Sequence, residues 1–152
     1  MSAEATLDAA WLRRHPLPVH PERTDKNSRG RVMLVGGSLL VPGGLILTAE
    51  AAFRAGAGKV QVALPEPLAI PTGIAVPEAG IFALPAEDGE IADAAGVADR
   101  LSGCDCLALG PAMASPAAAT AMMDALLPAA EAGPVVIDAA CVGAAAARLA
   151  AV

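Results

Sequence analysis

Short apolar runs alternate along the chain with longer alanine-rich segments, and glycine or proline separates most of them. Four apolar runs have the length and aliphatic content of strands that are buried on both faces of a parallel sheet. These runs lie at residues 31–35, 60–63, 104–109 and 134–137. The segments at residues 45–57, 117–132 and 141–151 are rich in good helix formers. Ser115 followed by Pro116 predicts an N-cap and first helical position for the second of these helices. This alternation predicts an α/β fold, in which helices flank both faces of a parallel sheet.

The other segments carry weaker signals. Residues 5–14 predict a short helix, and the prolines within residues 15–21 predict an extended linker after it. Between the second and third predicted strands, residues 68–72 are expected to form a helical turn. Residues 74–76 and 81–83 are expected to be short extended pieces outside the main sheet.

A further helix is predicted at residues 91–101. Acidic side chains surround this segment, and we interpret them as a solvated face. They are Glu87, Asp88, Glu90, Asp93 and Asp99.

A glycine-rich segment at residues 36–44 joins the first predicted strand to a predicted helix. Its spacing is neither the G-x-G-x-x-G of dinucleotide-binding loops nor the G-x-x-x-x-G-K of P-loops. A glycine-lined turn of this kind still offers backbone N–H groups and the positive end of a helix to a phosphate group. Tight turns and close helix packing without a ligand are the alternative.

Three of the predicted strands end at Gly36, Gly110 and Asp138. Because right-handed crossovers keep the strands parallel, these ends belong to one edge of the sheet. Ligands of open α/β sheets bind outside the carboxyl ends of the strands. The pattern therefore predicts a single crevice to which these turns contribute.

Composition narrows the classes of partner. The chain has 152 residues and a formal net charge of -6 at pH 7, and only 2% of its residues are aromatic. The acidic balance and the lack of stacking platforms argue against nucleic acid and anionic membranes as partners. No basic leader precedes an apolar segment, and the three cysteines lack metal-ligand spacing. We therefore expect a cytoplasmic protein with free thiols and no metal site.

Several short motifs occur in the order in which one enzyme family carries them. They are DKNSRGR (25–31), GGS (36–38), PGG (42–44), AAFRAGAG (51–58), VPEA (76–79), CLALGP (106–111) and VVIDA (135–139). On these motifs the chain resembles the first half of the ADP- or ATP-dependent NAD(P)H-hydrate dehydratases. These are metabolite-repair enzymes of the ribokinase-like superfamily.

The resemblance implies that NAD(P)H hydrate is the substrate and that ADP or ATP, with Mg²⁺, drives its dehydration. It implies six substrate-binding positions. They are Gly43, Gly44, Gly110, Ala112, Asp138 and Asn27. Ala112 departs from the family pattern, which has Gly-Pro-Gly where this chain has Gly-Pro-Ala. If the backbone there needs a positive φ, alanine costs stability, and its methyl group narrows the approach of a ligand.

The resemblance stops before the family's nucleotide-binding half. The family's His-Pro-Gly-Glu stretch and its Gly-Gly-Thr-Gly-Asp motif, which holds the catalytic aspartate, do not occur in the sequence up to Val152. We therefore expect residues 25–152 to be an incomplete ribokinase-like domain, truncated before the anion-hole half, behind a helical and proline-rich lead-in at residues 1–24. The chain is expected to supply no catalytic residue and to be inactive alone.

Two other functions stay open at this stage. One is a fragment of a ribokinase-like kinase for a small molecule, such as a vitamin precursor or a sugar. The other is a non-catalytic dinucleotide-binding module. In each case the sheet is expected to end at an uncovered fourth strand, which in so apolar a chain predicts a homo-oligomer or self-association.

Overall fold

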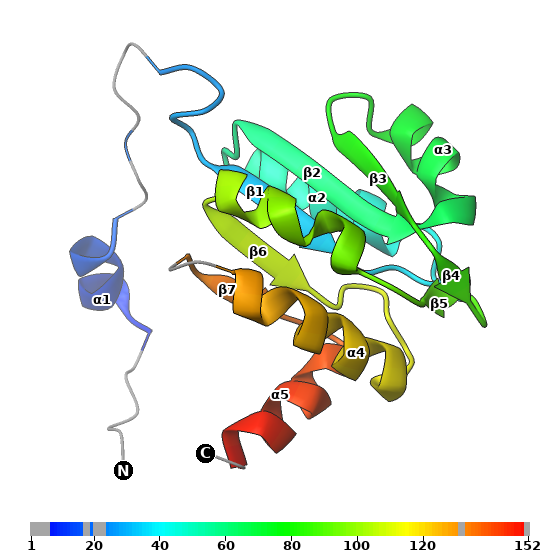
Figure 1. Ribbon diagram of the computed structural model, residues 1–152. Helices are drawn as coiled ribbons and strands as arrows, with labels where there is room; N and C mark the ends of the chain where they lie inside the picture. The colour runs from blue at the N-terminus through cyan, green and yellow to red at the C-terminus, as the bar shows by residue number, and fades with distance from the viewer. Residues whose placement is uncertain (1–6, 17–18, 20–23, 131–132, 151–152) are drawn as a thin grey trace.

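The computed structural model describes residues 7–16, 19, 24–130 and 133–150. Its centre is a parallel sheet of five strands in the order β3-β2-β1-β6-β7 (Figure 1). The strands are β1 (Arg31–Val35), β2 (Lys59–Pro65), β3 (Gly80–Leu84), β6 (Cys106–Leu109) and β7 (Val135–Ile137). The predicted α/β class and parallel sheet are confirmed.

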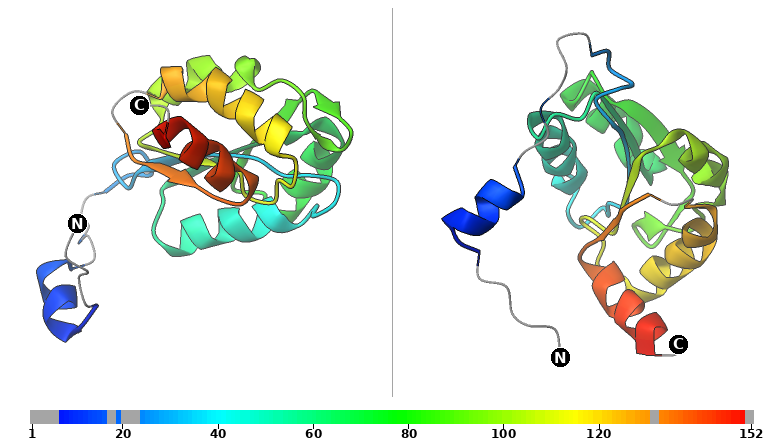
Figure 2. Two further views of the ribbon diagram at one scale, coloured as in Figure 1. Left: turned by 90° about the horizontal axis from the view of Figure 1, so that it is seen from below. Right: turned by 90° about the vertical axis from the view of Figure 1, so that its left-hand side faces the viewer.

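Helices cover both faces of the sheet (Figure 2). One face carries α2 (Gly44–Arg54) and α3 (Glu66–Ala75), and the other carries the 3₁₀ helix η1 (Ala95–Gly103), α4 (Pro116–Leu126) and α5 (Ala140–Ala150). The faces alternate along each strand because successive side chains of a strand point to opposite sides.

Strand β1 shows how the alternation builds two cores. Leu34 packs in one cluster with Leu45 and Ala49 of α2. Its neighbours Met33 and Val35 pack in the other cluster, which includes Met123 of α4 and is formed largely by α4 and η1. A strand buried on both sides needs apolar residues at every position, which is why the run reads as continuously hydrophobic.

Strand β3 corrects the predicted strand count from four to five. Residues 81–83 were expected to be an isolated extended piece, but Gly80–Leu84 pairs along its whole length with β2. The expected helical turn at residues 68–72 is a ten-residue helix, and residues 74–75, predicted as extended, belong to it. Tertiary packing explains the longer helix, because Leu68 and Thr72 are buried against the sheet.

The predicted helix at residues 91–101 is also wrong in its first half. Residues 86–91 form an antiparallel hairpin of β4 (Ala86–Glu87) and β5 (Glu90–Ile91), and helical structure begins only at Ala95. Asp88 and Gly89 connect the two short strands with φ angles of 50° and 80°. Two successive positive φ values are those of a type I′ turn, for which Asp-Gly is a preferred sequence.

Four of the five acidic residues interpreted as a solvated face are exposed, but Glu90 is not. Only 8% of Glu90 is exposed to solvent. The hairpin turns this side chain inward, toward the start of α4, and so separates it from its exposed neighbours Glu87 and Asp88.

The terminal helices differ from their predicted limits. The first, α1 (Ala9–Arg14), starts later than expected, because the Asp8 carboxylate accepts a hydrogen bond from the Trp11 amide and caps it there. Residues 5 and 6 of the first predicted helix lie outside the described part of the chain, as do residues 131–132 at the end of the helix predicted at 117–132 and residue 151 of the last one. Helix α4 begins as predicted, since the Ser115 hydroxyl accepts from the Ala118 amide and Pro116 occupies the first turn.

Candidate functional site

The glycine-rich loop 36–44 and the turn 110–115 lie side by side at the carboxyl edge of the sheet. The first follows β1 and the second follows β6, and these two strands are parallel neighbours. The Gly37 amide donates to the Pro111 carbonyl oxygen at 2.8 Å, and the Ser38 hydroxyl donates to the Ala112 carbonyl oxygen at 2.7 Å. The two segments that the topology was expected to bring together are therefore hydrogen-bonded to each other.

Close backbone contacts explain the glycines at this edge. A Cβ atom at Gly36 would lie 2.5 Å from the Pro111 carbonyl oxygen. One at Gly44 would collide with the Cβ atom of Ala112, and one at Gly110 would collide with the carbonyl oxygen of Asp138. Gly44, Gly110, Ala112 and Asp138 thus form two touching pairs, and only residues without a side chain fit at Gly44 and Gly110.

Ala112 has a φ angle of 61°, in the left-handed region that favours glycine. Asp88 and Ala139 are the other residues besides glycine with positive φ in the described part of the chain. Ala112 and Ala139 follow the carboxyl ends of β6 and β7 at the same edge of the sheet, whereas Asp88 belongs to the Asp-Gly turn of the hairpin. Such strained residues cluster at binding and catalytic sites, so this concentration favours a functional role for the edge.

The exposed atoms of the edge combine an apolar rim with polar groups. Leu39, Leu40 and Val41 are 49%, 77% and 46% exposed. Gly43 is the exposed N-cap residue of α2, and no side chain within the described residues caps this helix end. The Gly44 amide donates to the Val41 carbonyl oxygen at 3.1 Å. The amides that follow it at this positive helix end suit an anionic group, whereas the leucine and valine side chains suit an aromatic ring. The exposed carboxylate of Asp138 can accept hydrogen bonds from hydroxyl groups.

The β4–β5 hairpin is a third segment at this edge, and the sequence analysis did not predict it. The Leu39 amide donates to the Gly89 carbonyl oxygen at 2.8 Å. The Glu90 carboxylate accepts from the Ala114 amide at 2.8 Å and from the Ser115 amide at 3.1 Å. The Asp-Gly dipeptide at 88–89 is a sequence signal for a hairpin turn, whereas the sequence analysis interpreted Asp88 only as part of a solvated face.

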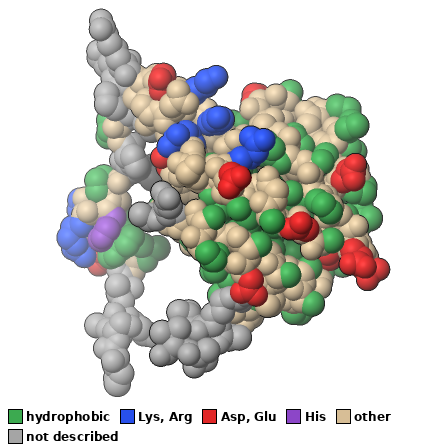
Figure 3. Space-filling model, viewed as in Figure 1, with side chains coloured by type: hydrophobic (Ala, Val, Ile, Leu, Met, Phe, Trp, Pro, Cys, Tyr) green, Lys and Arg blue, Asp and Glu red, His purple; other side chains and the backbone are tan. Residues whose placement is uncertain are grey.

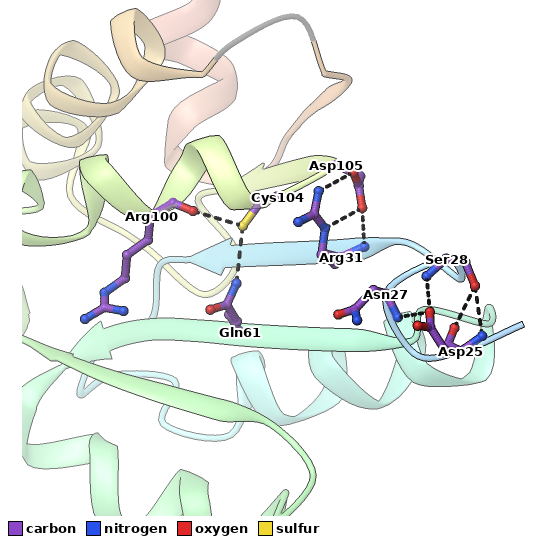
Figure 4. Close-up of polar contacts among 8 residues, drawn as sticks. All are labelled: Asp25, Asn27, Ser28, Arg31, Gln61, Arg100, Cys104 and Asp105. Carbon is purple, nitrogen blue, oxygen red and sulfur yellow. Dashed lines mark hydrogen bonds and ion pairs between the residues drawn. The ribbon is translucent and has the colours of Figure 1, made fainter.

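Asn27 lies at the opposite edge of the sheet, before the amino end of β1 (Figure 4). It belongs to a turn in which the Asp25 carboxylate accepts from the Asn27 amide at 2.9 Å and from the Ser28 amide at 2.8 Å. The hydrogen bonds from Ser28, and then from Asn27, lower the pKa of Asp25 below its usual value. The structure therefore does not bring Asn27 together with the other five predicted site residues.

An ion pair fastens β1 to β6 at this amino edge (Figure 4). The Arg31 guanidinium donates to both carboxylate oxygens of Asp105, at 3.0 Å and 2.9 Å, and the Arg31 amide donates to one of them at 2.8 Å. The side-chain hydrogen bond from Arg31, followed by that of its amide, lowers the pKa of Asp105 to about 2. This charge pair serves the packing of the strands rather than a ligand at the carboxyl edge.

Charge is unevenly distributed between the two edges. In Figure 3, lysine and arginine side chains gather at the upper left of the molecule, and most acidic side chains lie toward the right. The exposed residues concerned are Lys26, Arg29 and Lys59 at the amino edge, and Glu87 and Asp88 on the hairpin. An anionic ligand at the carboxyl edge would thus depend on backbone amides and not on nearby basic side chains.

Cys104 and Cys106 offer no activated nucleophile. Burial raises the pKa of the thiols of both Cys104 and Cys106, which keeps them protonated at neutral pH. Among the described residues, no group of three or more His, Cys, Asp or Glu side chains is placed to hold a metal ion. In the same part of the chain, the helices are too short or too polar to cross a membrane.

Comparison with known proteins identifies the family. The family model described as NAD(P)H-hydrate dehydratase matches residues 32–148. An ADP-dependent (S)-NAD(P)H-hydrate dehydratase from Xanthomonas campestris is 46% identical over 112 residues, covering 72% of this chain and 38% of the relative. A bifunctional NAD(P)H-hydrate repair enzyme from Moorella thermoacetica is 36% identical over 143 residues, covering 88% of this chain and 25% of the relative.

Solved structures show the same fold. A ribokinase-like superfamily protein from Enterococcus faecalis superimposes with a TM-score of 0.74 at 21% identity, covering 88% of this chain and 45% of that one. The ADP/ATP-dependent NAD(P)H-hydrate dehydratase from Bacillus subtilis, co-crystallized with ATP and Mg²⁺, gives 0.64 at 24% identity, covering 84% and 43%. This chain therefore spans less than half the length of each of these relatives, and it belongs to the NAD(P)H-hydrate dehydratase family.

Proposed function

We propose that this chain provides the dinucleotide-binding side of an ADP- or ATP-dependent NAD(P)H-hydrate dehydratase site. The hydrate would bind at the carboxyl edge, against Gly43, Gly44, Gly110, Ala112 and Asp138. The observation that carries this proposal is the hydrogen-bonded pairing of loop 36–44 with turn 110–115, in a chain of this family. Asn27 is left out of the proposed site because it lies at the other edge.

The chemistry of the ligand fits this edge. A dinucleotide has a diphosphate, which can accept hydrogen bonds from the free amides at the start of α2. Its rings can lie on the exposed side chains of residues 39–41, and its hydroxyl groups can donate to the Asp138 carboxylate. The hydrate differs from NAD(P)H by a ring hydroxyl, so a carboxylate near the ring would favour the hydrated form.

Dehydration needs more than this edge provides. Hydroxide is a poor leaving group, so the ring hydroxyl must first take a phosphoryl group from ADP or ATP, after which phosphate leaves and a ring proton is lost. Such a transfer requires a base, donors for the phosphoryl oxygens and Mg²⁺. The described residues hold no metal-binding group and the sequence has no Gly-Gly-Thr-Gly-Asp motif, so the residues of this chain do not fit the nucleotide and its metal ion. We propose that it binds the hydrate and does not catalyse the reaction alone.

Isothermal titration with NADPH hydrate, and separately with ADP, tests the proposal. We expect NADPH hydrate to bind with a dissociation constant below about 1 mM, which corresponds to about 4 kcal/mol, and ADP not to bind. Asp138→Ala should weaken binding of the hydrate by at least about 10-fold, as loss of a hydrogen bond to a charged group does. Asp99→Ala, which removes another exposed carboxylate, is the control. Binding of ADP without the hydrate would contradict the proposal.

We also propose that the chain self-associates through β7. This strand ends the sheet, its Val136 is 55% exposed, and Val142 of the adjacent α5 is 54% exposed. An uncovered strand with apolar side chains favours pairing with another copy. Sedimentation velocity should show a concentration-dependent increase in mass that Val136→Lys reduces. Ile70→Lys, at an exposed site on α3, should leave it unchanged, and a wild-type monomer at every concentration would refute the idea.

We place the protein in the cytoplasm. None of the three cysteines forms a disulfide, and two of them, Cys104 and Cys106, are partly accessible. Free and partly accessible thiols are typical of proteins in a reducing compartment. Fractionation of cells that produce the protein, with the redox state of the thiols trapped by alkylation, would test the location.

A further inference from the structure

Glu90 is a buried carboxylate that the proposed binding of the hydrate does not use. It lies on β5, and only 8% of it is exposed. Oε1 accepts from the Ala114 and Ser115 amides at 2.8 Å and 3.1 Å, while the buried Oε2 has no hydrogen-bond partner among the described residues. Acidic side chains are rarely this buried unless they are paired, so the position calls for an explanation.

The two amides that Glu90 binds belong to the turn of the proposed site. Turn 110–115 contains Gly110 and Ala112 and ends at Ser115, the N-cap residue of α4. The carboxylate oxygen accepts from both amides, so one side chain bonds two successive residues of the turn. Glu90 thus holds the last two residues of the turn in place.

The hairpin that carries Glu90 is itself fixed to the glycine-rich loop. The Leu39 amide donates to the Gly89 carbonyl oxygen, and the Ser38 hydroxyl donates to the Ala112 carbonyl oxygen. Loop 36–44, the hairpin and turn 110–115 are therefore joined in a closed ring of hydrogen bonds. Among the described residues, Glu90 makes the side-chain hydrogen bonds between the hairpin and the turn.

The turn needs such a restraint because Ala112 is not a glycine. Its φ of 61° places an alanine in a region that L-residues avoid, and an unrestrained alanine would leave that region for a negative φ. A change of this size would rotate the peptide groups next to Ala112 and so move the backbone of the turn. Two hydrogen bonds oppose this change. The Ser38 hydroxyl holds the Ala112 carbonyl oxygen, and Glu90 holds the Ala114 amide.

We propose that Glu90 is a positioning residue of the carboxyl-edge site, which acts on the ligand by fixing turn 110–115 in its binding conformation. The inference rests on the proposed function for the identity of the ligand. The effect of Glu90 on the conformation of turn 110–115 can be measured without any ligand. Glu90 touches neither the ligand nor reacting atoms, so its effect must pass through the backbone of the turn.

Three variants separate this role from general stability. Glu90→Ala removes the acceptor, Glu90→Gln keeps an acceptor oxygen at the same reach, and Glu87→Ala removes an exposed carboxylate from the same hairpin. The first measurement is amide hydrogen exchange by NMR on the 152-residue chain. We expect exchange at Ala114 and Ser115 to be at least about 10-fold faster in Glu90→Ala, and within about 3-fold of wild type in Glu90→Gln and Glu87→Ala.

The second measurement is the dissociation constant for NADPH hydrate, taken where each variant is fully folded. We expect it to rise about 10-fold in Glu90→Ala and to return to within about 3-fold of wild type in Glu90→Gln. Val60→Ala, a core change in β2, lies in the other hydrophobic cluster, which contains no residue of the turn, and should leave the constant unchanged. If Glu90→Ala does not fold, Glu90→Leu fills the same space without an acceptor and replaces it.

The two measurements fail in different ways. If wild type does not bind the hydrate, the proposed function is wrong, and the exchange data still decide whether Glu90 fixes the turn. Unchanged exchange in Glu90→Ala overturns the inference. Faster exchange with an unchanged dissociation constant also overturns it, because Glu90 would then support the fold alone.

Discussion

Gly110→Ala is expected to destabilise the protein by about 3–5 kcal/mol, which is at the upper end for a single substitution. The residue has a φ of 101°, which an alanine adopts only under strain. The new Cβ atom would also collide with the Asp138 carbonyl oxygen and would lie 2.9 Å from the Cβ and Sγ atoms of Cys141. Backbone atoms of β6 and of the start of α5 cannot both move away without breaking their hydrogen bonds. Urea unfolding followed by circular dichroism measures the loss.

Gly43→Ala is the matched control. This glycine lies at the same edge of the sheet, has a φ of -89°, and a Cβ atom added to it would meet nothing within 4 Å. We expect its free energy of unfolding to stay within about 0.5 kcal/mol of wild type, as for other unconstrained surface changes. If Gly43→Ala and Gly110→Ala lowered the free energy of unfolding equally, the packing between turn 110–115 and Asp138 would differ from the one described.

Gly44→Ala is expected to cost about 2–3 kcal/mol, and Ala112→Gly is expected to restore most of it. The added methyl group would collide with the Ala112 Cβ atom, whereas its next contacts, with the Ala112 Cα and Val41 Cγ1 atoms, are ordinary ones at 3.5 Å. The space between the start of α2 and the turn thus holds one methyl group, and it accepts that group from either side. Removing it from Ala112 also relieves the positive φ of that residue.

A double-mutant cycle measures this coupling. Unfolding of wild type, the two single variants and the double variant should give an interaction free energy of at least about 1.5 kcal/mol. The pair Gly43→Ala and Ala112→Gly is the control, and its effects should be additive because a methyl group on Gly43 reaches no neighbour. Additive effects for Gly44 and Ala112 would mean that the turn moves freely away from α2.

Features with a local signal were predictable. Residues 31–35 form a strand with the predicted limits because the apolar run ends at glycines. The start of α4 was predicted from Ser115 and Pro116, which supply a hydroxyl acceptor and a ring that fits the first helical turn. The sequence analysis expected alanine at position 112 to cost stability if the backbone there has a positive φ, and Ala112 has a φ angle of 61°.

Features without a local signal were not predictable. The prolines at residues 65–85 obscured the sequence signals of α3 and β3. Pro71, for example, lowers the helix propensity of its segment, but packing against the sheet outweighs that effect in α3. Glu90 follows two acidic residues and reads as one more surface charge. Its burial depends on a hairpin that points it at amides 24 and 25 residues away in the sequence.

The sequence by itself determined the α/β class, the family, and the edge of the sheet at which the glycine-rich turns meet. The class and the edge follow from apolar runs, from turn residues and from the right-handed connection of parallel strands. The family follows from the resemblance of short motifs in their order along the chain. Only the tertiary structure decided which backbones touch there. It joined Ser38 to Ala112 across 74 residues, set Glu90 against the turn and left Asn27 at the far edge. Such contacts depend on the register and twist of the assembled sheet, which no short segment encodes.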